Sequence, residues 1–271
     1  MNWIWREQRG IKTIRILEWE REGVLMAFSS RSGGVSQKPY DSLNLALHVG
    51  DQPDDVLANR EILATSLGIK PKQVVCAEQV HGNQVALVGP GECGRGAFAY
   101  ADALPGVDAL VTDSTGVYLM EFFADCLPVF FFDPVSRVVA LAHAGWKGTA
   151  GKVVQATVAA MQIKYCCQPR NLQVFIGPGV GTECYTVDQD RKNQVERVFT
   201  FTDNIFYSKG SGIYTWDLQL TNQMLLMECG VPEVNIGLCR LCTSCSPDIF
   251  FSYRAAGGQT GRMAAVLGIR E

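Results

Sequence analysis

Short apolar runs bounded by turn-forming residues recur along the chain, and their lengths are typical of buried β-strands. Several of these runs follow one another with no helical stretch between them, as at 74–88 and 109–142. The predicted strands are Val24–Ser29, Val74–Val80, Gln84–Val88, Ala109–Thr112, Val117–Phe123, Val129–Phe132, Val138–Ala142, Leu172–Ile176, Val234–Leu238 and Ile249–Tyr253.

Helical stretches interleave with these strands. In DDVLANREILATSLG, residues 54–68, apolar residues recur at helical spacing, Asp54 or Asp55 is placed to cap the start, and Gly68 ends the pattern. Further helices are predicted at Thr149–Lys164, Asp188–Phe199 and Leu218–Cys229. Because the strands come partly in consecutive pairs, the pattern favours an α+β fold with a mixed sheet over a doubly wound parallel one.

The pattern also predicts one domain over residues 1–271. No Pro/Ser/Gly-rich linker, internal repeat or low-complexity tract divides the sequence. A chain of this length buries roughly 75% of its unfolded surface, so it has enough residues for a sizeable core.

The charge balance indicates a small-molecule partner. There are 24 Lys and Arg against 27 Asp and Glu, a net charge of −3, and no block of like charges. The sequence therefore has no cluster of basic residues of the kind that binds nucleic acid or an acidic membrane. The first residues mix Trp with Arg and Glu, and the most apolar region, 117–142, is interrupted by charges well before the ~18 residues that a membrane span needs. We expect a soluble, cytoplasmic protein.

The ten cysteines are expected to be free thiols, because no export signal accompanies them in a chain of this length. The run CRLCTSC holds Cys239, Cys242 and Cys245. Zinc ribbons use pairs of Cys-x₂-Cys knuckles, and here one run stands without a second. A structural zinc on these three cysteines stays an alternative to buried or incidental thiols.

Known phosphate-binding motifs are absent from the sequence. No G-x-G-x-x-G follows a strand and opens a helix, and no G-x-x-x-x-G-K-[ST] occurs. The glycine-rich GPGVGTECY, residues 177–185, predicts a tight turn near a ligand, and a phosphate loop is the alternative interpretation.

The most informative residue is His143, which directly follows the apolar run 138–142 in a chain with only three histidines. A buried imidazole needs partners for its two nitrogens. His81 and Cys126 also stand at the ends of predicted strands, and two imidazoles with one thiolate make an open zinc site. His81 and Cys126 are 45 residues apart and Cys126 and His143 are 17 apart, so the three do not form a short metal-binding motif. The alternatives are a histidine paired with a carbonyl or carboxylate and a cysteine that packs as a small apolar residue, whereas His48 is interpreted as a loop histidine.

An ordered set of motifs makes the chain recognisable from about Ser29 to Gly268. They are SSRSGGVSQKPYDSLNLALHVGD, EQVHGNQV, DALVTDSTGVYLMEFFADCLPVFFFD, ALAHAGWKGTAGKVV, IGPGVGTECYTV and FFSYR…TGR. Together they resemble the laccase-domain family, also called the multicopper-polyphenol-oxidase-like or peptidoglycan editing factor family, whose members include bacterial purine nucleoside phosphorylases. One departure is SYRAAGG, where the family often has a second basic residue after the arginine.

The resemblance implies a fold, a metal and an activity. The fold is a single domain with sheets layered between helices, an αββα-like sandwich, and the matching His81, Cys126 and His143 form a zinc site. The activity is phosphorolysis of adenosine, inosine or guanosine to the free base and ribose 1-phosphate. Adenosine deamination and methylthioadenosine cleavage are attributed to similar proteins.

Candidate substrate contacts lie in or near the matching motifs. Asn44 and Arg60 are predicted to donate to ribose or phosphate, against the alternatives of a turn residue and a solvated or ion-paired helix residue. Arg254 and Arg262 are predicted anion contacts. Asp125, beside Cys126, is the predicted carboxylate that moves protons, although neighbours on a strand point to opposite faces.

Three other functions compete with zinc-dependent phosphorolysis. Copper-dependent polyphenol oxidation needs several imidazole-rich copper centres, and three histidines are too few to build them in one chain. A cysteine-dependent hydrolase that edits peptidoglycan precursors would use Cys126 as nucleophile with His81 or His143 as its base. A non-catalytic metal or nucleotide-binding module would bind without turnover.

Overall fold

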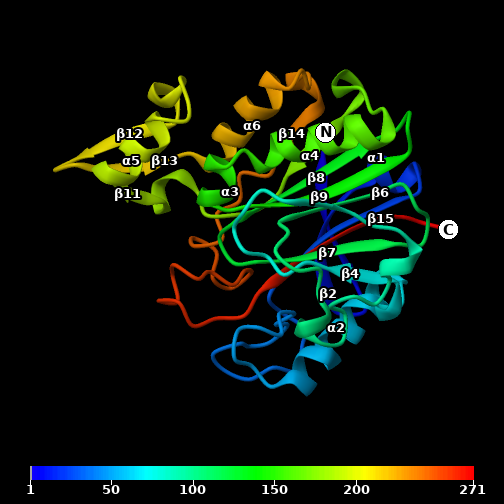
Figure 1. The fold of residues 1–271 in the computed structure, drawn as a ribbon. Helices are drawn as coiled ribbons and strands as arrows, with labels where there is room; N and C mark the ends of the chain where they lie inside the picture. The colour runs from blue at the N-terminus through cyan, green and yellow to red at the C-terminus, as the bar shows by residue number, and fades with distance from the viewer. Residues whose placement is uncertain (1) are drawn as a thin grey trace.

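The computed structural model describes residues 2–271, and most of its strands belong to two six-stranded sheets that face each other (Figure 1). The first sheet has the order β1 (Trp3–Gln8), β2 (Ile11–Ile16), β3 (Val24–Ser29), β15 (Met263–Ile269), β7 (Tyr118–Phe123), β4 (Val74–Cys76). The second has the order β14 (Ile236–Leu238), β10 (Gln173–Ile176), β8 (Leu127–Asp133), β9 (Val138–Ala144), β6 (Ala109–Thr112), β5 (Val85–Leu87). Both sheets are mixed, because β4–β7, β10–β14 and β5–β6 pair in parallel and their other pairs are antiparallel.

Helices cover the outer faces of the two sheets, so that the molecule has four layers (Figure 1). Helix α2 (Pro53–Leu67) packs on the first sheet, and α4 (Val153–Tyr165) and α6 (Leu218–Glu228) pack on the second. The remaining helices are α1 (Leu17–Arg21), α3 (Trp146–Ala150) and α5 (Gln189–Glu196). The predicted α+β class and its layered arrangement are confirmed.

A small third sheet projects from this body beside α5 (Figure 1). Its strand order is β11 (Thr186–Asp188), β13 (Ile213–Trp216), β12 (Phe206–Gly210), with antiparallel pairing. Its inner end packs on the main body through Trp216, which is fully buried beside the second sheet's helical layer.

The space between the large sheets is filled by aromatic side chains. Phe28 and Phe123 of the first sheet pack edge to face at 6.0 Å between ring centroids, and Phe130 and Phe132 of β8 join the same core. Successive residues of a strand point to opposite faces, so Val129 and Phe131 pack instead toward the helices. Burial on both faces explains why β8 and β9 read as continuous apolar runs.

Comparison of the predicted strands with the structure shows good agreement in the middle of the chain. β3 and β6 have the predicted bounds, and seven further predicted strands occur with bounds that are shorter or, for β8 and β9, longer than predicted. The strand predicted at Ile249–Tyr253 is wrong, because this segment is a turn whose Phe250 and Phe251 fill the inter-sheet core. Strands that the pattern did not predict are β1, β2, β11, β12, β13 and β15.

Two predicted helices need correction. Helix α2 begins at Pro53 after Gln52, so Asp54 and Asp55 lie in its first turn and do not cap it, while Gly68, at φ 70°, ends it as predicted. The stretch predicted as one helix from Thr149 to Lys164 is two helices, α3 and α4, because the backbone of Lys152 adopts φ 62° between them.

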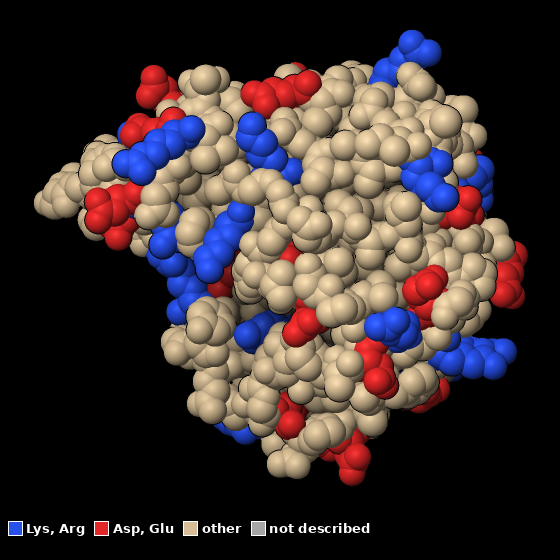
Figure 2. All heavy atoms as spheres, in the orientation of Figure 1, with Lys and Arg blue, Asp and Glu red and all other residues tan. Residues whose placement is uncertain are grey.

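Within residues 2–271, no helix is both long and apolar enough to cross a lipid bilayer. Figure 2 shows acidic and basic side chains interspersed on one face, with several Lys and Arg side chains around a hollow below the projecting β11–β13 sheet. The predicted location inside the cell stays a prediction.

Candidate metal and substrate site

The structure brings His81, Cys126 and His143 together, with candidate ligand atoms that all lie within 4.8 Å of one another. Strand pairing explains two of the three. β8 and β9 are antiparallel, with Leu127 opposite Ala144, so Cys126 and His143 meet at the same end of this pair although 17 residues separate them. His81 reaches the same place from the loop between β4 and β5.

Backbone features make room for this group. His81 lies in the left-handed region at φ 62°, an uncommon conformation for a residue with a side chain. Gly145 lies opposite the donors, and a Cβ there would be 2.8 Å from Cys126 Sγ and 3.1 Å from His81 Cδ2. A glycine is therefore required at this position if the three donors are to stay close.

The fully buried Asp108 holds two of the donors in place. Its Oδ1 accepts from His143 Nδ1 at 2.9 Å and from the His81 amide at 2.9 Å, and its Oδ2 accepts from the Gly82 amide at 2.6 Å. Burial raises the pKa of Asp108, but the His143 ring and these amides outweigh it and lower the pKa overall. The carboxylate thus fixes the ring of His143 so that Nε2 is the nitrogen left for a ligand.

The surroundings of Cys126 favour the thiolate form of its side chain. Burial raises its pKa, but the charge and hydrogen bonds of His143 and His81 lower it to about 6. Burial lowers the pKa of His143, while Cys126 and Asp108 raise it to about 10. In the absence of a metal, the two groups therefore form a thiolate–imidazolium pair.

These residues fit an open zinc site. Two imidazoles and one thiolate leave a fourth position for water or substrate, and a histidine whose second nitrogen bonds a carboxylate is the usual support of such a ligand. A lowered thiol pKa also suits metal binding, because the thiolate is the ligand. The same donor set is compatible with copper.

A cavity of about 490 Å³ opens onto the three donors. We call the side that carries His81, Cys126 and His143 the strand-end wall. The name loop wall is used for five lining residues that come from loops, which are Val180, Tyr185, Tyr253, Arg254 and Arg262. Cavities of this size hold small molecules.

Two arginines bring positive charge to the loop wall. The guanidinium of Arg254 donates to the carbonyl and hydroxyl of Thr186 at 2.9 and 2.7 Å and lies 5.3 Å from the centre of the Tyr185 ring. Arg262 donates through Nη1 to the carbonyl of Thr260 at 2.6 Å and lies 5.6 Å from the Tyr253 ring. Each guanidinium has five N–H donors, so nitrogens remain to bind an anion.

Asp125 also lines the cavity, but its carboxylate is already engaged by the loops. Oδ1 accepts from the Thr243 hydroxyl at 2.6 Å and Oδ2 from the Arg254 amide at 2.7 Å, and the backbone of Asp125 is left-handed at φ 85°. Asp125, which directly precedes Cys126, is therefore tied to two separate loops.

Asn44 and Arg60 lie outside the cavity lining and support its walls. The Asn44 side chain is fully buried, and its Oδ1 accepts from the Arg262 amide at 2.9 Å. Arg60 donates to the carbonyls of Leu45 at 2.8 Å and Gly96 at 2.7 Å. Its guanidinium covers the ring of the cavity residue Phe122 at 4.7 Å.

The sequence interpretation missed three residues near the site. His48 lines the cavity and packs against Tyr100, and burial together with the charges of Arg262 and Arg60 lowers its pKa to about 4. Asp108 stands immediately before the predicted strand Ala109–Thr112, and an acid at the start of a buried strand was a usable signal.

The third missed residue, Glu121, is fully buried in β7, and neither carboxylate oxygen has a hydrogen-bond partner. It faces the inter-sheet space, as do Leu119 and Phe123. Burial raises its pKa well above the ordinary value, although the charge of His143 opposes this. Nothing in the apolar run that contains Glu121 indicates that its carboxyl group is buried near the donors.

Comparison with known proteins shows the family of this chain. Residues 25–270 match the family model described as multi-copper polyphenol oxidoreductase laccase. The chain belongs to this family. The resemblance noted in the sequence is therefore confirmed, and the laccase-like family name refers to metal centres, although the identity of the metal is not established by it.

Proteins named purine nucleoside phosphorylase are similar to this chain along nearly its whole length. Purine nucleoside phosphorylase YlmD of Geobacillus stearothermophilus is 41% identical over 250 residues, 92% of this chain and 91% of the relative. Purine nucleoside phosphorylase YlmD of Bacillus subtilis is 36% identical over 264 residues, covering 96% and 95%. The crystal structure of YlmD from Geobacillus stearothermophilus superposes with a TM-score of 0.95 at 38% identity, covering 100% of both chains.

Proposed function

We propose that this protein is a zinc-dependent purine nucleoside phosphorylase that converts adenosine, inosine or guanosine and phosphate to the free base and ribose 1-phosphate. The observation that carries the proposal is one cavity with a metal-type donor group on its strand-end wall and two arginines on its loop wall. Relatives named purine nucleoside phosphorylases support the same reaction class and an enzymatic role.

The cavity suits a nucleoside in size and lining. Aromatic side chains of the lining, among them Phe122, Trp146 and Tyr185, offer rings against which a purine can pack. The polar groups are few and come from fixed positions, as in most small-molecule sites. The base is expected between these rings, with the ribose between the donor group and the arginines.

His81, Cys126 and His143 would hold the zinc ion. When bound, zinc supplies a Lewis acid that polarises a substrate oxygen or nitrogen or acidifies a water. Asp108 keeps the ring of His143 oriented for this task through its bond to Nδ1, and it holds the backbone of His81 through the His81 amide.

Arg254 and Arg262 would bind hydrogen phosphate and direct one of its oxygens at C1′ of the ribose. The new bond joins this oxygen to C1′, the C1′–N9 bond breaks, and its electron pair leaves with the purine. The proton that hydrogen phosphate loses ends on the purine, so that atoms and charge balance. The chain's contribution is to hold both reactants in line and to keep cationic donors on the phosphate.

Deamination of adenosine and cleavage of methylthioadenosine are proposed as further activities of the same cavity. In deamination, the oxygen of a water molecule bonds to C6 of adenosine, the bond from C6 to the amino nitrogen breaks, and the amino group takes a proton from the water and leaves as ammonia, so that inosine is the product. Asp125, which lines the cavity and directly precedes Cys126 in the chain, is the carboxylate that would carry the protons.

The test is an assay on purified protein of measured metal content, with adenosine and inosine incubated with and without phosphate. We expect adenine, hypoxanthine and ribose 1-phosphate to form only when phosphate is present. As a matched control, Cys166→Ser replaces an exposed cysteine away from the cavity and should behave as the wild type. Unchanged nucleosides with a fully metal-loaded protein would contradict the proposal.

One observation favours a second candidate, a cysteine-dependent hydrolase acting on a peptidoglycan precursor. Cys126, His143 and Asp108 have the order of a nucleophile, a base and an orienting carboxylate, with the 2.9 Å bond from His143 Nδ1 to Asp108. This mechanism needs a metal-free thiolate. Alkylation of Cys126 by iodoacetamide in the protein as purified would favour the hydrolase, whereas protection that is lost on chelation would favour the zinc enzyme.

A further inference from the structure

A second group of three sulfurs lies apart from the strand-end wall. Cys184, Cys242 and Cys245 have Sγ atoms within 4.8 Å of one another, and the Sγ atoms of Cys184 and Cys245 are 3.2 Å apart. The sequence had grouped Cys239 with Cys242 and Cys245, but Cys239 is buried in the inter-sheet core. Cys184, from the glycine-rich loop 177–185, takes the third place instead.

The backbone of two loops brings these sulfurs together. Gly179 and Cys242 form an isolated parallel bridge, in which the Thr243 amide donates to the Gly179 carbonyl at 2.9 Å. The Gly181 amide donates to Cys242 Sγ at 3.1 Å. A Cβ at Gly181 would be 2.9 Å from Cys242 Cβ, so this approach of amide to sulfur requires glycine.

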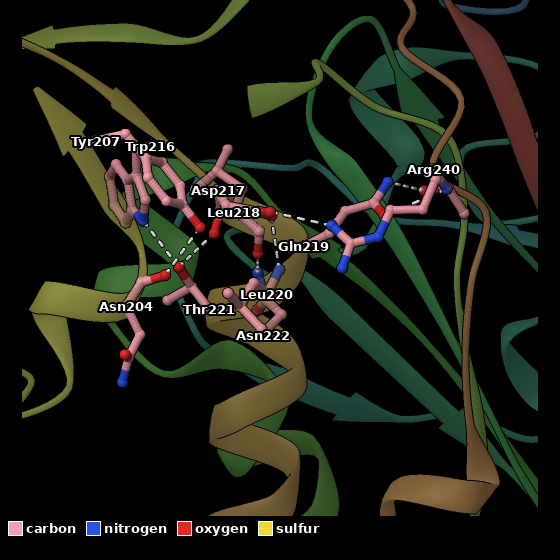
Figure 3. A network of polar contacts seen from close by, with 11 residues as sticks. Asn204, Tyr207, Trp216, Asp217, Leu218, Gln219, Leu220, Thr221, Asn222 and Arg240 are labelled. Carbon is pink, nitrogen blue, oxygen red and sulfur yellow. Dashed lines mark hydrogen bonds and ion pairs between the residues drawn. The ribbon is translucent and has the colours of Figure 1, made fainter. Parts of the chain in front are cut away.

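The start of α6 holds both loops in position (Figure 3). Asp217 caps this helix and pairs with the Arg240 guanidinium at 3.0 Å, and Gln219 accepts from the Arg240 amide at 3.3 Å. Gln219 also donates to the Gly177 carbonyl at 3.3 Å. The loop that carries Cys184 and the loop that carries Cys242 and Cys245 are thus tied to one helix end, and the sulfur group is preformed.

We propose that Cys184, Cys242 and Cys245 bind a second, thiophilic metal ion, with zinc as the expected occupant. Cys242 and Cys245 have the Cys-x₂-Cys spacing of a zinc knuckle, and the third sulfur comes from a separate loop, as in structural zinc sites. Zinc–sulfur bonds of about 2.3 Å in a tetrahedron put sulfurs about 3.8 Å apart. The three sulfurs reach this arrangement with small side-chain movements.

The surroundings suit a metal thiolate. The Gly181 amide donates to Cys242 Sγ at 3.1 Å, and a donor at this position favours a thiolate. Cys245 is exposed, which gives an ion a path of entry and leaves the fourth position to water.

The second site would brace the loop wall. Cys184 precedes the cavity residue Tyr185, and Thr243, which follows Cys242, donates to the Asp125 carboxylate at 2.6 Å. An ion on the three sulfurs would therefore fix the loops that present Tyr185 and position Asp125, without contacting the substrate.

Metal content per chain tests the proposal independently of the activity. We would express the protein in zinc-supplemented medium, purify it with a reductant and count zinc by mass spectrometry. The wild type is expected to hold two ions, and Cys184→Ser and Cys245→Ser to hold one. Cys126→Ser removes a donor of the strand-end group and should also hold one, whereas the exposed control Cys166→Ser should hold two. Cobalt substitution should give a thiolate charge-transfer band in Cys126→Ser that is absent from the double variant with Cys184→Ser.

Two results would overturn the second site. One is a zinc content that is the same in Cys184→Ser, Cys245→Ser and Cys166→Ser. The other is a Cys184–Cys245 disulfide in the purified protein, seen as a mass lower by two hydrogens that reductant restores, with no loss of zinc in either variant. A loss of one ion from both cluster variants supports the proposal even where the strand-end group proves empty, so the two claims fail separately.

Discussion

The two walls of the cavity are built in different ways. On the strand-end wall, Cys126 and His143 are held by the β8–β9 ladder, and the buried Asp108 fixes the ring of His143. On the loop wall, the guanidinium groups of Arg254 and Arg262 are held by hydrogen bonds to carbonyls and a hydroxyl of loops. Groups that must keep a metal's geometry lie on the rigid scaffold, and groups that must fit a substrate lie on loops that it positions.

This difference predicts which kinetic parameter each wall controls. Loss of a strand-end donor should remove metal and turnover together, because all three donors serve one ion. Loss of a loop-wall arginine should weaken the binding of one substrate and leave the metal in place. The proposed second metal ion would compensate for the looser construction of the loops.

The largest effect is expected for His143→Ala. Removing this donor should release the metal from the strand-end wall and lower kcat/KM by about 10³-fold, because a Lewis acid contributes several kcal/mol to the transition state. Circular dichroism and thermal unfolding should show a retained fold. Turnover that survives in this metal-poor variant would contradict the proposed mechanism.

Asp108→Asn is expected to have the next largest effect. The amide keeps the size of the side chain but loses the charge that orients His143, so metal affinity and kcat should both fall by about 10- to 100-fold. Chelator competition measures the affinity. Unchanged affinity with a normal fold would show that the β-ladder alone positions the donors, and this would break the distinction between the two walls.

A smaller and different effect is expected for Arg262→Ala. Loss of a charge-assisted hydrogen bond to phosphate, about 1.5 kcal/mol, should raise the KM for phosphate about tenfold. The KM for inosine and the metal content should change little. Arg262→Lys keeps a cation and should recover part of the loss. An equal rise in both KM values would place this arginine in a general structural role.

The smallest effect is expected for Glu121, beneath the strand-end wall. Burial raises its pKa in the folded protein, so the folded state holds this proton more tightly than the unfolded state does. Stability should therefore decrease as pH rises above the ordinary value of 4.5, by up to about 1.4 kcal/mol per pH unit until the folded group ionises.

Glu121→Gln should remove this part of the pH dependence, and at pH 7 it should melt higher than the wild type by a few degrees, at roughly 2–4 °C per kcal/mol. Denaturant unfolding at pH 5 and pH 7 measures the slope. Glu121→Met, which keeps an unbranched side chain, serves as a second variant. Identical slopes in all three proteins would show that Glu121 does not titrate in this range.

Local pattern was sufficient where burial on both faces leaves an apolar run, as in β3, β6 and β9. It failed for β15, whose small residues carry a weak strand signal and whose Gly268 lies against Tyr118. It also failed at Phe250 and Phe251, where a turn fills the core between two sheets and an apolar run is no strand.

The sequence by itself determined the fold class and singled out the residues of the candidate metal site, because strand and helix periodicity and the rarity of histidine can be read directly from the chain. The tertiary structure alone decided that Asp108 orients His143, that Asn44 and Arg60 lie behind the cavity, and that Cys184 rather than Cys239 joins Cys242 and Cys245. Strand register and the paths of the loops decide which of these residues meet. Contacts between residues far apart in the chain cannot be read from the spacing of neighbouring residues.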